Sequence, residues 1–266
     1  MPVVEIEQAG GTTAVSYLVE GEGPGLLLVH GTGGTGESNW RPLIDAVRDR
    51  FTVVAPDLSG SGATTDAGGP LTAETLAEQA EAAAAHAGLE RYAVVGHSLG
   101  ATVAAAVAGR RPEAVTALVL HAGWVRSDAP MAFMTDLWAR LMRTDPELFA
   151  RLLQLTAMGP DTQRARTAAD FEAAVAGFTT MLEPGILRQV DLDGRADVTA
   201  LVARITAPTT VLASAHDQII PTYHQRDLAS RIPGARYVEV NAGHGLPFED
   251  PQGFVDVVVE ALGRSL

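Results

Sequence analysis

The 266-residue sequence contains no cysteine and no lysine. Without cysteine there is no thiol nucleophile, cysteine-ligated zinc or disulfide bond, and a reducing compartment is the natural setting. Without lysine, Schiff-base chemistry and a lysine-bearing phosphate loop are excluded. No apolar run reaches the length of a membrane span, and the N-terminus lacks the basic-then-apolar order of a secretory signal. We therefore expect a cytoplasmic protein with no membrane span.

Basic residues are also scarce, because 19 arginines stand against 32 acidic residues and give a formal net charge of −13. Nucleic-acid binding draws its strength from basic side chains that replace counterions, so we expect no nucleic-acid partner. The length allows one large α/β domain or two small ones. It also suffices to bury a core without help from a metal or a disulfide. The oligomeric state is not readable from the sequence.

Short apolar runs rich in β-branched residues alternate with helical patterns and glycine or proline turns, which predicts a doubly wound, mostly parallel sheet. Residues 3–20 read as a two-stranded hairpin around Gly10 and Gly11. The clearest helices are expected at residues 72–87, 99–109 and 251–262, the first with a threonine cap. The predicted buried strands are Leu26–His30, Thr52–Ala55, Tyr92–Val95, Ala117–His121, Thr209–Ala213 and Arg236–Val240.

The alternation stops between residues 124 and 187, where the pattern is helical and no strand is convincing. We interpret this segment as a helical insertion into a core formed by residues 1–123 and 188–266. It contains every methionine except the first, and also several aromatic residues. These side chains could line a pocket or fill the core of the insertion, and the sequence leaves both readings open. The methionines are Met131, Met134, Met142, Met158 and Met181.

Residues Gly96–Gly100 have the sequence Gly-His-Ser-Leu-Gly and lie between a predicted strand and a predicted helix. A serine nucleophile must stand clear of the backbone within reach of a base, and a sharp strand-to-helix turn achieves this. The turn brings neighbouring backbone so close that its flanking positions need glycine. It also directs the N–H of Leu99 toward an oxyanion formed on the substrate. Ser98 is therefore the candidate nucleophile.

A serine nucleophile needs a histidine to take its proton and a carboxylate to orient that histidine. Asp217 follows the predicted strand Thr209–Ala213, and His244 follows the last predicted strand. Both residues thus leave the carboxyl ends of strands, the edge at which sites assemble in open α/β sheets. The chain order Ser, Asp, His is the order expected for this architecture. We predict a triad of Ser98, Asp217 and His244, with Asp128 as the fallback acid.

A glycine-rich loop, Gly31–Gly36, follows the first buried strand. It could supply a second N–H group to the oxyanion, with Thr32 as the first choice and Gly33 as its neighbour. We interpret His30 as a structural residue that braces this loop rather than as a base.

These motifs resemble those of the α/β-hydrolase superfamily over nearly the whole chain outside the insertion. The motifs are His30-Gly31, the segment Pro56–Gly62, the Ser98 turn, Asp217 with Pro221, and Gly243-His244. The resemblance implies an eight-stranded, mostly parallel sheet with a helical cap inserted after the sixth strand, here Ala117–His121. It assigns no chemistry to Asp57. Serine at position 98 separates this chain from the epoxide hydrolases and haloalkane dehalogenases, which carry aspartate there.

A rival interpretation comes from the same glycine-rich loop, since Gly31–Gly36 also fits the pattern G-x-G-x-x-G after a strand. Asp57 lies at the distance at which a dinucleotide fingerprint places its acidic residue. A nicotinamide- or flavin-dependent oxidoreductase is therefore a remote alternative. It would leave Ser98, Asp217 and His244 unexplained.

The predicted function is serine hydrolysis of an ester, lactone or thioester bond in a medium-sized apolar substrate, through an acyl-enzyme and without metal or organic cofactor. We expect His121, Trp124, Met134 and Trp138 to bind the substrate. Two narrower alternatives stay open. The segment from His30 to Trp40 is similar to the start of carbon–carbon bond hydrolases that act on ring-fission products, although their catalytic histidine usually precedes an aromatic residue and His244 precedes Gly245. A biosynthetic, non-hydrolytic reaction is equally compatible with an intact triad.

Overall fold

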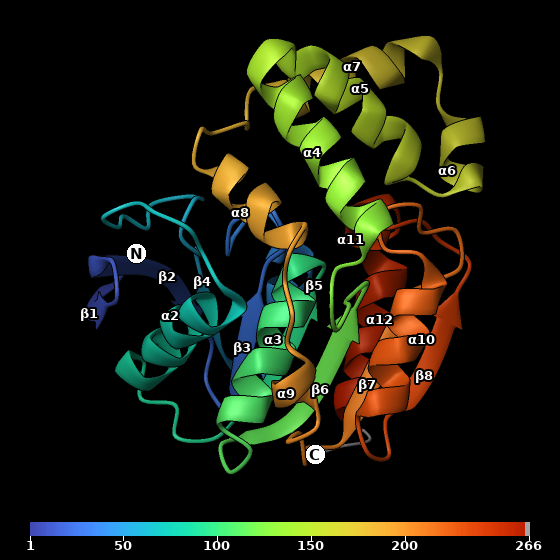
Figure 1. The fold of residues 1–266 in the computed structure, drawn as a ribbon. Helices are drawn as coiled ribbons and strands as arrows, with labels where there is room; N and C mark the ends of the chain where they lie inside the picture. Colours follow the sequence, from blue (N-terminus) through green and yellow to red (C-terminus); the bar gives the residue numbers. More distant parts are fainter. Residues whose placement is uncertain (264–266) are drawn as a thin grey trace.

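An eight-stranded sheet runs through the structure, a computed structural model that describes residues 1–263 (Figure 1). Its strand order is β1-β2-β4-β3-β5-β6-β7-β8. The hairpin β1–β2 is antiparallel and pairs antiparallel to β4, whereas the remaining pairings are parallel. The predicted mostly parallel sheet is therefore confirmed. The strands are β1 Val3–Gln8, β2 Gly11–Glu20, β3 Gly25–Val29, β4 Thr52–Pro56, β5 Tyr92–His97, β6 Val115–His121, β7 Thr209–Ser214 and β8 Arg236–Val240.

The central strands are buried and mostly apolar because both faces of the sheet are covered. In β6, Leu118 and Leu120 pack toward the face covered by helices α2 (Ala73–His86) and α3 (Leu99–Arg110). Ala117 and Val119 pack toward the opposite face, with α1 (Arg41–Val47) and α12 (Pro251–Gly263). The two-residue alternation of a strand thus decides which helix layer each side chain meets.

Local sequence signals set the ends of the predicted helices. Thr72 caps α2, because its hydroxyl accepts the N–H of Thr75 at 3.0 Å, and the helix stops before Gly88, whose φ is +82°. A left-handed residue at this position favours glycine. Two further helices follow β7 in the chain, α10 Thr222–Arg231 and α11 Leu246–Glu249.

Between β6 and β7 the chain forms helices rather than strands. In Figure 1, α4 to α7 lie above the upper edge of the sheet, and α8 lies between them and the sheet. The predicted boundary at residue 187 falls inside α8, so the division into core and cap stays a prediction. Among residues 1–263, no helix combines the length and apolarity needed to cross a membrane. The helices are α4 Ala129–Thr144, α5 Pro146–Thr156, α6 Pro160–Ala165, α7 Ala168–Thr179, α8 Ile186–Asp193 and α9 Thr199–Val202.

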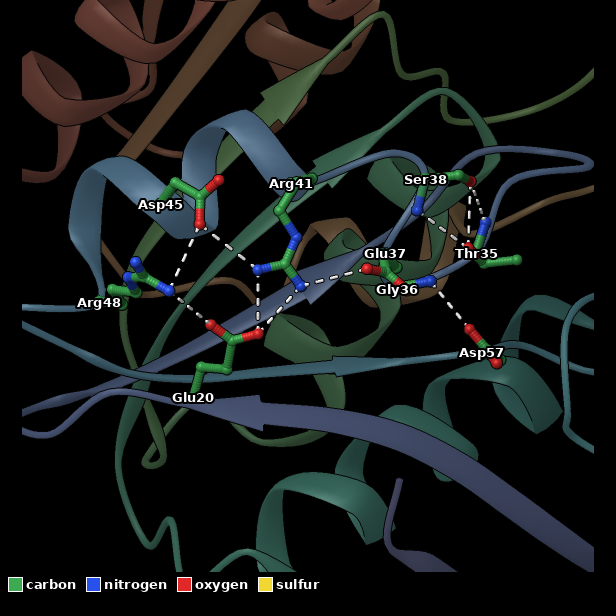
Figure 2. Close-up of polar contacts among 9 residues, drawn as sticks. All are labelled: Glu20, Thr35, Gly36, Glu37, Ser38, Arg41, Asp45, Arg48 and Asp57. Atoms are coloured by element: carbon green, nitrogen blue, oxygen red, sulfur yellow. Dashed lines mark hydrogen bonds and ion pairs between the residues drawn. The ribbon is translucent and has the colours of Figure 1, made fainter.

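Polar contacts fasten the glycine-rich loop that follows β3 (Figure 2). The N–H of Gly36 donates to Asp57 Oδ1 at 2.9 Å, and the N–H of Ala63 donates to Oδ2 of the same carboxylate at 3.0 Å. Arg41, the first residue of α1, donates to Glu20 at the end of β2 at 2.9 Å. These contacts hold the C-terminal end of the loop, and the start of α1 that follows it, against the sheet.

Candidate active site

The turn between β5 and α3 holds Ser98 in a strained backbone conformation, with φ 57° and ψ −124°. Only two residues other than glycine have positive φ among those described, and Ser98 is one of them. A side chain at Gly96 would place its Cβ in collision with the carbonyl oxygen of Gly100. A side chain at Gly100 would likewise collide with the carbonyl oxygen of Val29. Both flanking glycines are therefore required by close backbone approach, and the strain presents the serine hydroxyl at the top of the sheet.

The predicted serine, histidine and aspartate meet in one hydrogen-bonded row. His244 Nε2 lies 2.9 Å from Ser98 Oγ, and His244 Nδ1 lies 2.9 Å from Asp217 Oδ2. All three side chains are buried, and Ser98 is the most exposed of them at 9 %. An ionised Asp217 accepts only, so Nδ1 carries the proton and Nε2 is left to accept from the serine hydroxyl.

Backbone groups fix the orientation of Asp217. Its Oδ1 accepts the N–H groups of Ile219 at 2.9 Å and Ile220 at 2.7 Å, while Oδ2 faces His244 and also receives Gln225 Nε2 at 3.3 Å. Asp128, the fallback acid, lies elsewhere: it caps α4 and accepts the hydroxyl of Tyr223 at 2.6 Å. The carboxylate beside His244 is thus that of Asp217.

The glycine-rich loop passes Ser98 and leaves one N–H group free. The N–H of Gly33 donates to Gln189 Oε1 at 2.8 Å, and that of Gly34 to the carbonyl of Gly31 at 3.0 Å. The N–H of Gly31 donates to Asn39 Oδ1 at 3.1 Å, whereas that of Thr32 has no acceptor among the described residues. Thr32 rather than Gly33 is therefore the available donor of this loop.

The second candidate donor is the N–H of Leu99, the first residue of α3. The first N–H groups of a helix have no acceptor within the helix, so this one is available. Two buried hydrogen bonds of His30 brace the glycine-rich loop: Nδ1 donates to the carbonyl of Gly31 at 2.8 Å, and Nε2 accepts the N–H of Leu58 at 2.9 Å. Burial lowers the pKa of His30, which keeps its ring neutral. Thr32 and Leu99 can then both point N–H groups at an oxyanion.

A cavity of about 360 Å³ opens above Ser98 and His244, and helices α4, α5, α7 and α8 form much of its wall. Most of its side chains are apolar. Trp124, Met134 and Trp138, which were predicted to bind substrate, all lie in this wall. Of the five methionines of the insertion, Met142 alone is not part of it and packs against the hydrophobic core. The remaining methionines are Met131, Met134, Met158 and Met181.

Residues 24–251 match a family model described as alpha/beta hydrolase fold. The chain belongs to the α/β-hydrolase family. A relative from Xenorhabdus hominickii, named pyrrolizixenacetamide deacetylase, is 38 % identical over 247 residues, which are 92 % of this chain and 93 % of the relative. A second, from Azorhizobium caulinodans, bears the name "Putative carbamate hydrolase RutD" and is 30 % identical over 96 % of this chain and 97 % of its own.

Among solved structures, a thermophilic esterase from Thermogutta terrifontis, with malate bound, superposes with a TM-score of 0.85 at 26 % identity, over 100 % of this chain and 99 % of the other. The resemblance drawn from the sequence motifs is confirmed, and the molecule is an enzyme of the α/β-hydrolase family. This family membership agrees with the sheet order and with the row of Ser98, His244 and Asp217.

His121, which the sequence predicts to bind the substrate, does not line the cavity. His121 is fully buried and lies beneath the cavity, where Nδ1 contacts His97 Nδ1 at 2.9 Å and Nε2 contacts Ser214 Oγ at 3.0 Å. Its ring also packs on Phe254 of α12, with centroids 5.4 Å apart. His121 follows Ala117 and Val119 at two-residue spacing, so its side chain belongs to the α12 face of the sheet. Burial lowers its pKa to about 3, and the ring stays neutral.

The dinucleotide interpretation also fails on the geometry around Asp57. Both oxygens of this carboxylate accept backbone N–H groups, from Gly36 and Ala63, and Asp57 is only 3 % exposed, so a ribose hydroxyl cannot reach it. Helix α1 starts at Arg41, five residues past the last glycine of the loop, so no helix N-terminus meets the glycines as a dinucleotide site requires.

No sequence motif singles out Asp193, which lines the same cavity at the end of α8. It is 5 % exposed, and its Oδ2 accepts the hydroxyl of Thr32 at 2.7 Å. Burial raises the pKa of Asp193 to about 7, against the smaller opposing effects of the Thr32 hydrogen bond and the charge of His244. A second acid thus stands beside the loop that faces Ser98.

Asp193→Asn should raise the thermal stability of the enzyme at pH 8 more than at pH 5. Since the pKa of Asp193 rises from 3.8 to about 7 on folding, the folded protein binds this proton more tightly than the unfolded chain. The stabilisation from this group is full below pH 3.8 and is lost as the pH rises to about 7. The amide keeps the shape and never ionises.

Thermal unfolding of both proteins between pH 5 and 8 measures the effect, and the gain in Tm should level off above the pKa of Asp193. The control is Asp191→Asn on the exposed side of the same helix, paired with Arg195, for which no such trend is expected. If the difference in Tm between Asp193→Asn and the wild type did not vary with pH, the raised pKa of Asp193 would be contradicted.

Proposed function

We propose that this chain is a serine hydrolase that cleaves the acyl bond of a medium-sized, mostly apolar carboxylic acid derivative. The observation that carries the proposal is the row of Ser98, His244 and Asp217, with successive contacts of 2.9 Å. Esters, lactones and thioesters fit this chemistry, and the names of the two curated relatives add amides and carbamates as candidate substrates. The insertion serves as a cap over the substrate.

In the first half-reaction, Ser98 Oγ attacks the carbonyl carbon while its proton passes to His244 Nε2. The carbonyl oxygen becomes an oxyanion, which accepts hydrogen bonds from the N–H groups of Thr32 and Leu99. Asp217 stabilises the imidazolium. When the intermediate collapses, His244 gives the proton to the leaving group, and the acyl group stays on Ser98.

In the second half-reaction, water attacks the acyl-enzyme, with His244 Nε2 taking a proton from the water. The second tetrahedral intermediate uses the same two N–H donors. Its collapse releases the carboxylic acid, and the proton held by His244 returns to Ser98 Oγ. Apart from water, no step requires a group outside this chain and its substrate.

A fluorophosphonate probe tests the proposal because it phosphonylates an activated serine through the same attack. We expect one covalent label, on Ser98, and its complete loss in Ser98→Ala. Ser38→Ala is the matched control, since Ser38 lies in the wall of the same cavity. This variant should still be labelled on Ser98. A label that survives Ser98→Ala on folded protein would refute the proposed nucleophile.

The apolar cavity also predicts the preferred acyl length. In a series of p-nitrophenyl esters, kcat/KM should rise from acetyl to medium chains, as more methylene groups are buried, and fall once the chain outgrows a volume of about 360 Å³. Lactone and vinylogous diketone substrates run in parallel would separate ester hydrolysis from carbon–carbon bond hydrolysis.

A further inference from the structure

One oxygen of the Asp193 carboxyl has no partner. Oδ2 accepts the hydroxyl of Thr32 at 2.7 Å, whereas Oδ1 is buried with no hydrogen bond to any described residue. The side chain lines the cavity together with Ser98 and His244. Buried polar atoms are paired in most proteins, and those left unpaired need an explanation.

The backbone that carries this carboxyl is held in place. The hydroxyl of Ser127 donates to the carbonyl of Asp193 at 2.7 Å, and Trp124 Nε1 donates to that hydroxyl at 3.1 Å. At Gly194, the next residue, a Cβ would fall on the hydroxyl of Thr135. Asp193 therefore cannot easily turn away to find another protein partner for Oδ1.

The surroundings make an unpaired acceptor costly. Most of the cavity wall is apolar, and Oδ1 has almost no surface that water reaches even in the free enzyme. A substrate with an O–H or N–H group at this place pairs with Oδ1. A substrate without a donor leaves a desolvated oxygen unpaired, and so binds less well.

We propose that Asp193 is a specificity-determining residue that accepts a hydrogen bond from an O–H or N–H group close to the scissile carbonyl of the substrate. The position follows from Thr32, whose hydroxyl binds Asp193 and whose N–H is the proposed donor to the oxyanion. This inference rests on the proposed function. The donor is either a hydroxyl on the carbon next to the carbonyl or the N–H of a secondary amide or carbamate.

Two matched substrate pairs distinguish the two sources of the donor. The first compares phenyl 2-hydroxyhexanoate with phenyl 2-methoxyhexanoate, and the second compares hexananilide with its N-methyl derivative. In each pair the second member lacks the donor. At pH 8, where the Asp193 carboxyl is mostly ionised and accepts only, we expect the wild type to prefer the donor-bearing substrate of at least one pair in kcat/KM by about ten- to a hundredfold. Effects that change kcat/KM equally for both members of a pair cancel in this ratio.

Asp193→Asn should abolish that preference. With the oxygen of the new amide accepting from Thr32, the substituted side chain would turn its NH₂ group toward the substrate and offer a donor where an acceptor was. Thermal unfolding confirms that the variant is folded. The decisive readout is the ratio between the two members of a pair, because a general structural defect slows both alike.

Thr32→Val separates a direct contact from an effect through Thr32. This variant loses the hydroxyl that binds Asp193 but keeps the backbone N–H and the carboxyl. If Asp193 contacts the substrate, the donor preference persists in Thr32→Val, whatever happens to the rate. If the preference disappears there as it does in Asp193→Asn, then Asp193 acts only by positioning Thr32, and the inference is overturned.

The failure of this inference differs from the failure of the proposed function. A wild type that takes the fluorophosphonate label and hydrolyses the esters, but discriminates within neither pair, overturns the role of Asp193 alone. The same holds for a preference that survives Asp193→Asn. A wild type without label and without hydrolysis overturns both.

Discussion

Replacing Asp217 by asparagine is expected to lower kcat by about four orders of magnitude while leaving the fold intact. The reason lies in the contacts of the carboxylate. Oδ1 accepts the N–H groups of Ile219 and Ile220, so in the variant the amide oxygen must take that place. The NH₂ group then faces His244 Nδ1 and donates to it, which puts the imidazole proton on Nε2. In this tautomer Nε2 cannot accept the proton of Ser98.

Steady-state kinetics on the best ester of the acyl series measures this loss, and circular dichroism and thermal unfolding check the fold. Asp128→Asn is the control, because Asp128 caps α4 and binds Tyr223 away from His244. Its kcat should stay within a few-fold of the wild type. If Asp128→Asn lost activity and Asp217→Asn kept it, the acid of the triad would have been misassigned.

The parts of the fold that could be predicted are those encoded in local sequence. The run Tyr92–Val95, the glycines at 96 and 100 and the alanine-rich stretch that follows are typical of a strand, a tight turn and a helix, and the structure has β5, the Ser98 turn and α3 there. The order of Ser98, Asp217 and His244 along the chain could be read for the same reason, since each residue follows a strand whose carboxyl end meets the others at one edge.

What could not be predicted depends on partners distant in the chain. His121 ends a strand at the correct edge of the sheet, but the pleat decides which face its side chain points to, and neighbouring strands set the register of that pleat. Asp193 looks in the sequence like one of several acidic residues on a surface helix. Asp193 is buried because α8 packs against the glycine-rich loop. Thr32 binds Asp193 and Gly33 binds Gln189 there, and each pair is more than 150 residues apart in the sequence.

The contact between the insertion and the His244 loop is another long-range feature. The N–H of Gly245 donates to the carbonyl of Ala157 at 2.7 Å, and the Glu249 carboxylate accepts the N–H groups of both Gly159 and Gly243. A Cβ at Gly243 would collide with the backbone of the insertion. These contacts thus join the His244 loop to the middle of the proposed cap, so a shift of this part of the insertion would also shift the loop that carries His244.

Gly100→Ala is expected to destabilise the protein by about 3 kcal/mol or more, through overpacking rather than through backbone conformation. Gly100 lies in α3, and its φ is not positive. An added Cβ would instead fall on the carbonyl oxygens of Val29 and His30, at the end of β3. Either α3 or the start of the glycine-rich loop must move. Because Ser98 precedes α3 and Thr32 follows His30, this movement should separate the proposed nucleophile from the proposed oxyanion donor.

We expect Tm to fall by roughly 10 °C for a chain of this size, and kcat to fall by about a hundredfold in the molecules that remain folded. Gly177→Ala is the matched control. Gly177 is an exposed residue of α7 whose added Cβ would meet nothing within 4 Å, so alanine should leave stability unchanged or raise it slightly. Equal stability of the two variants would mean that α3 does not approach β3 as closely as described. Since the strained Ser98 turn depends on that approach, its geometry would then need another cause.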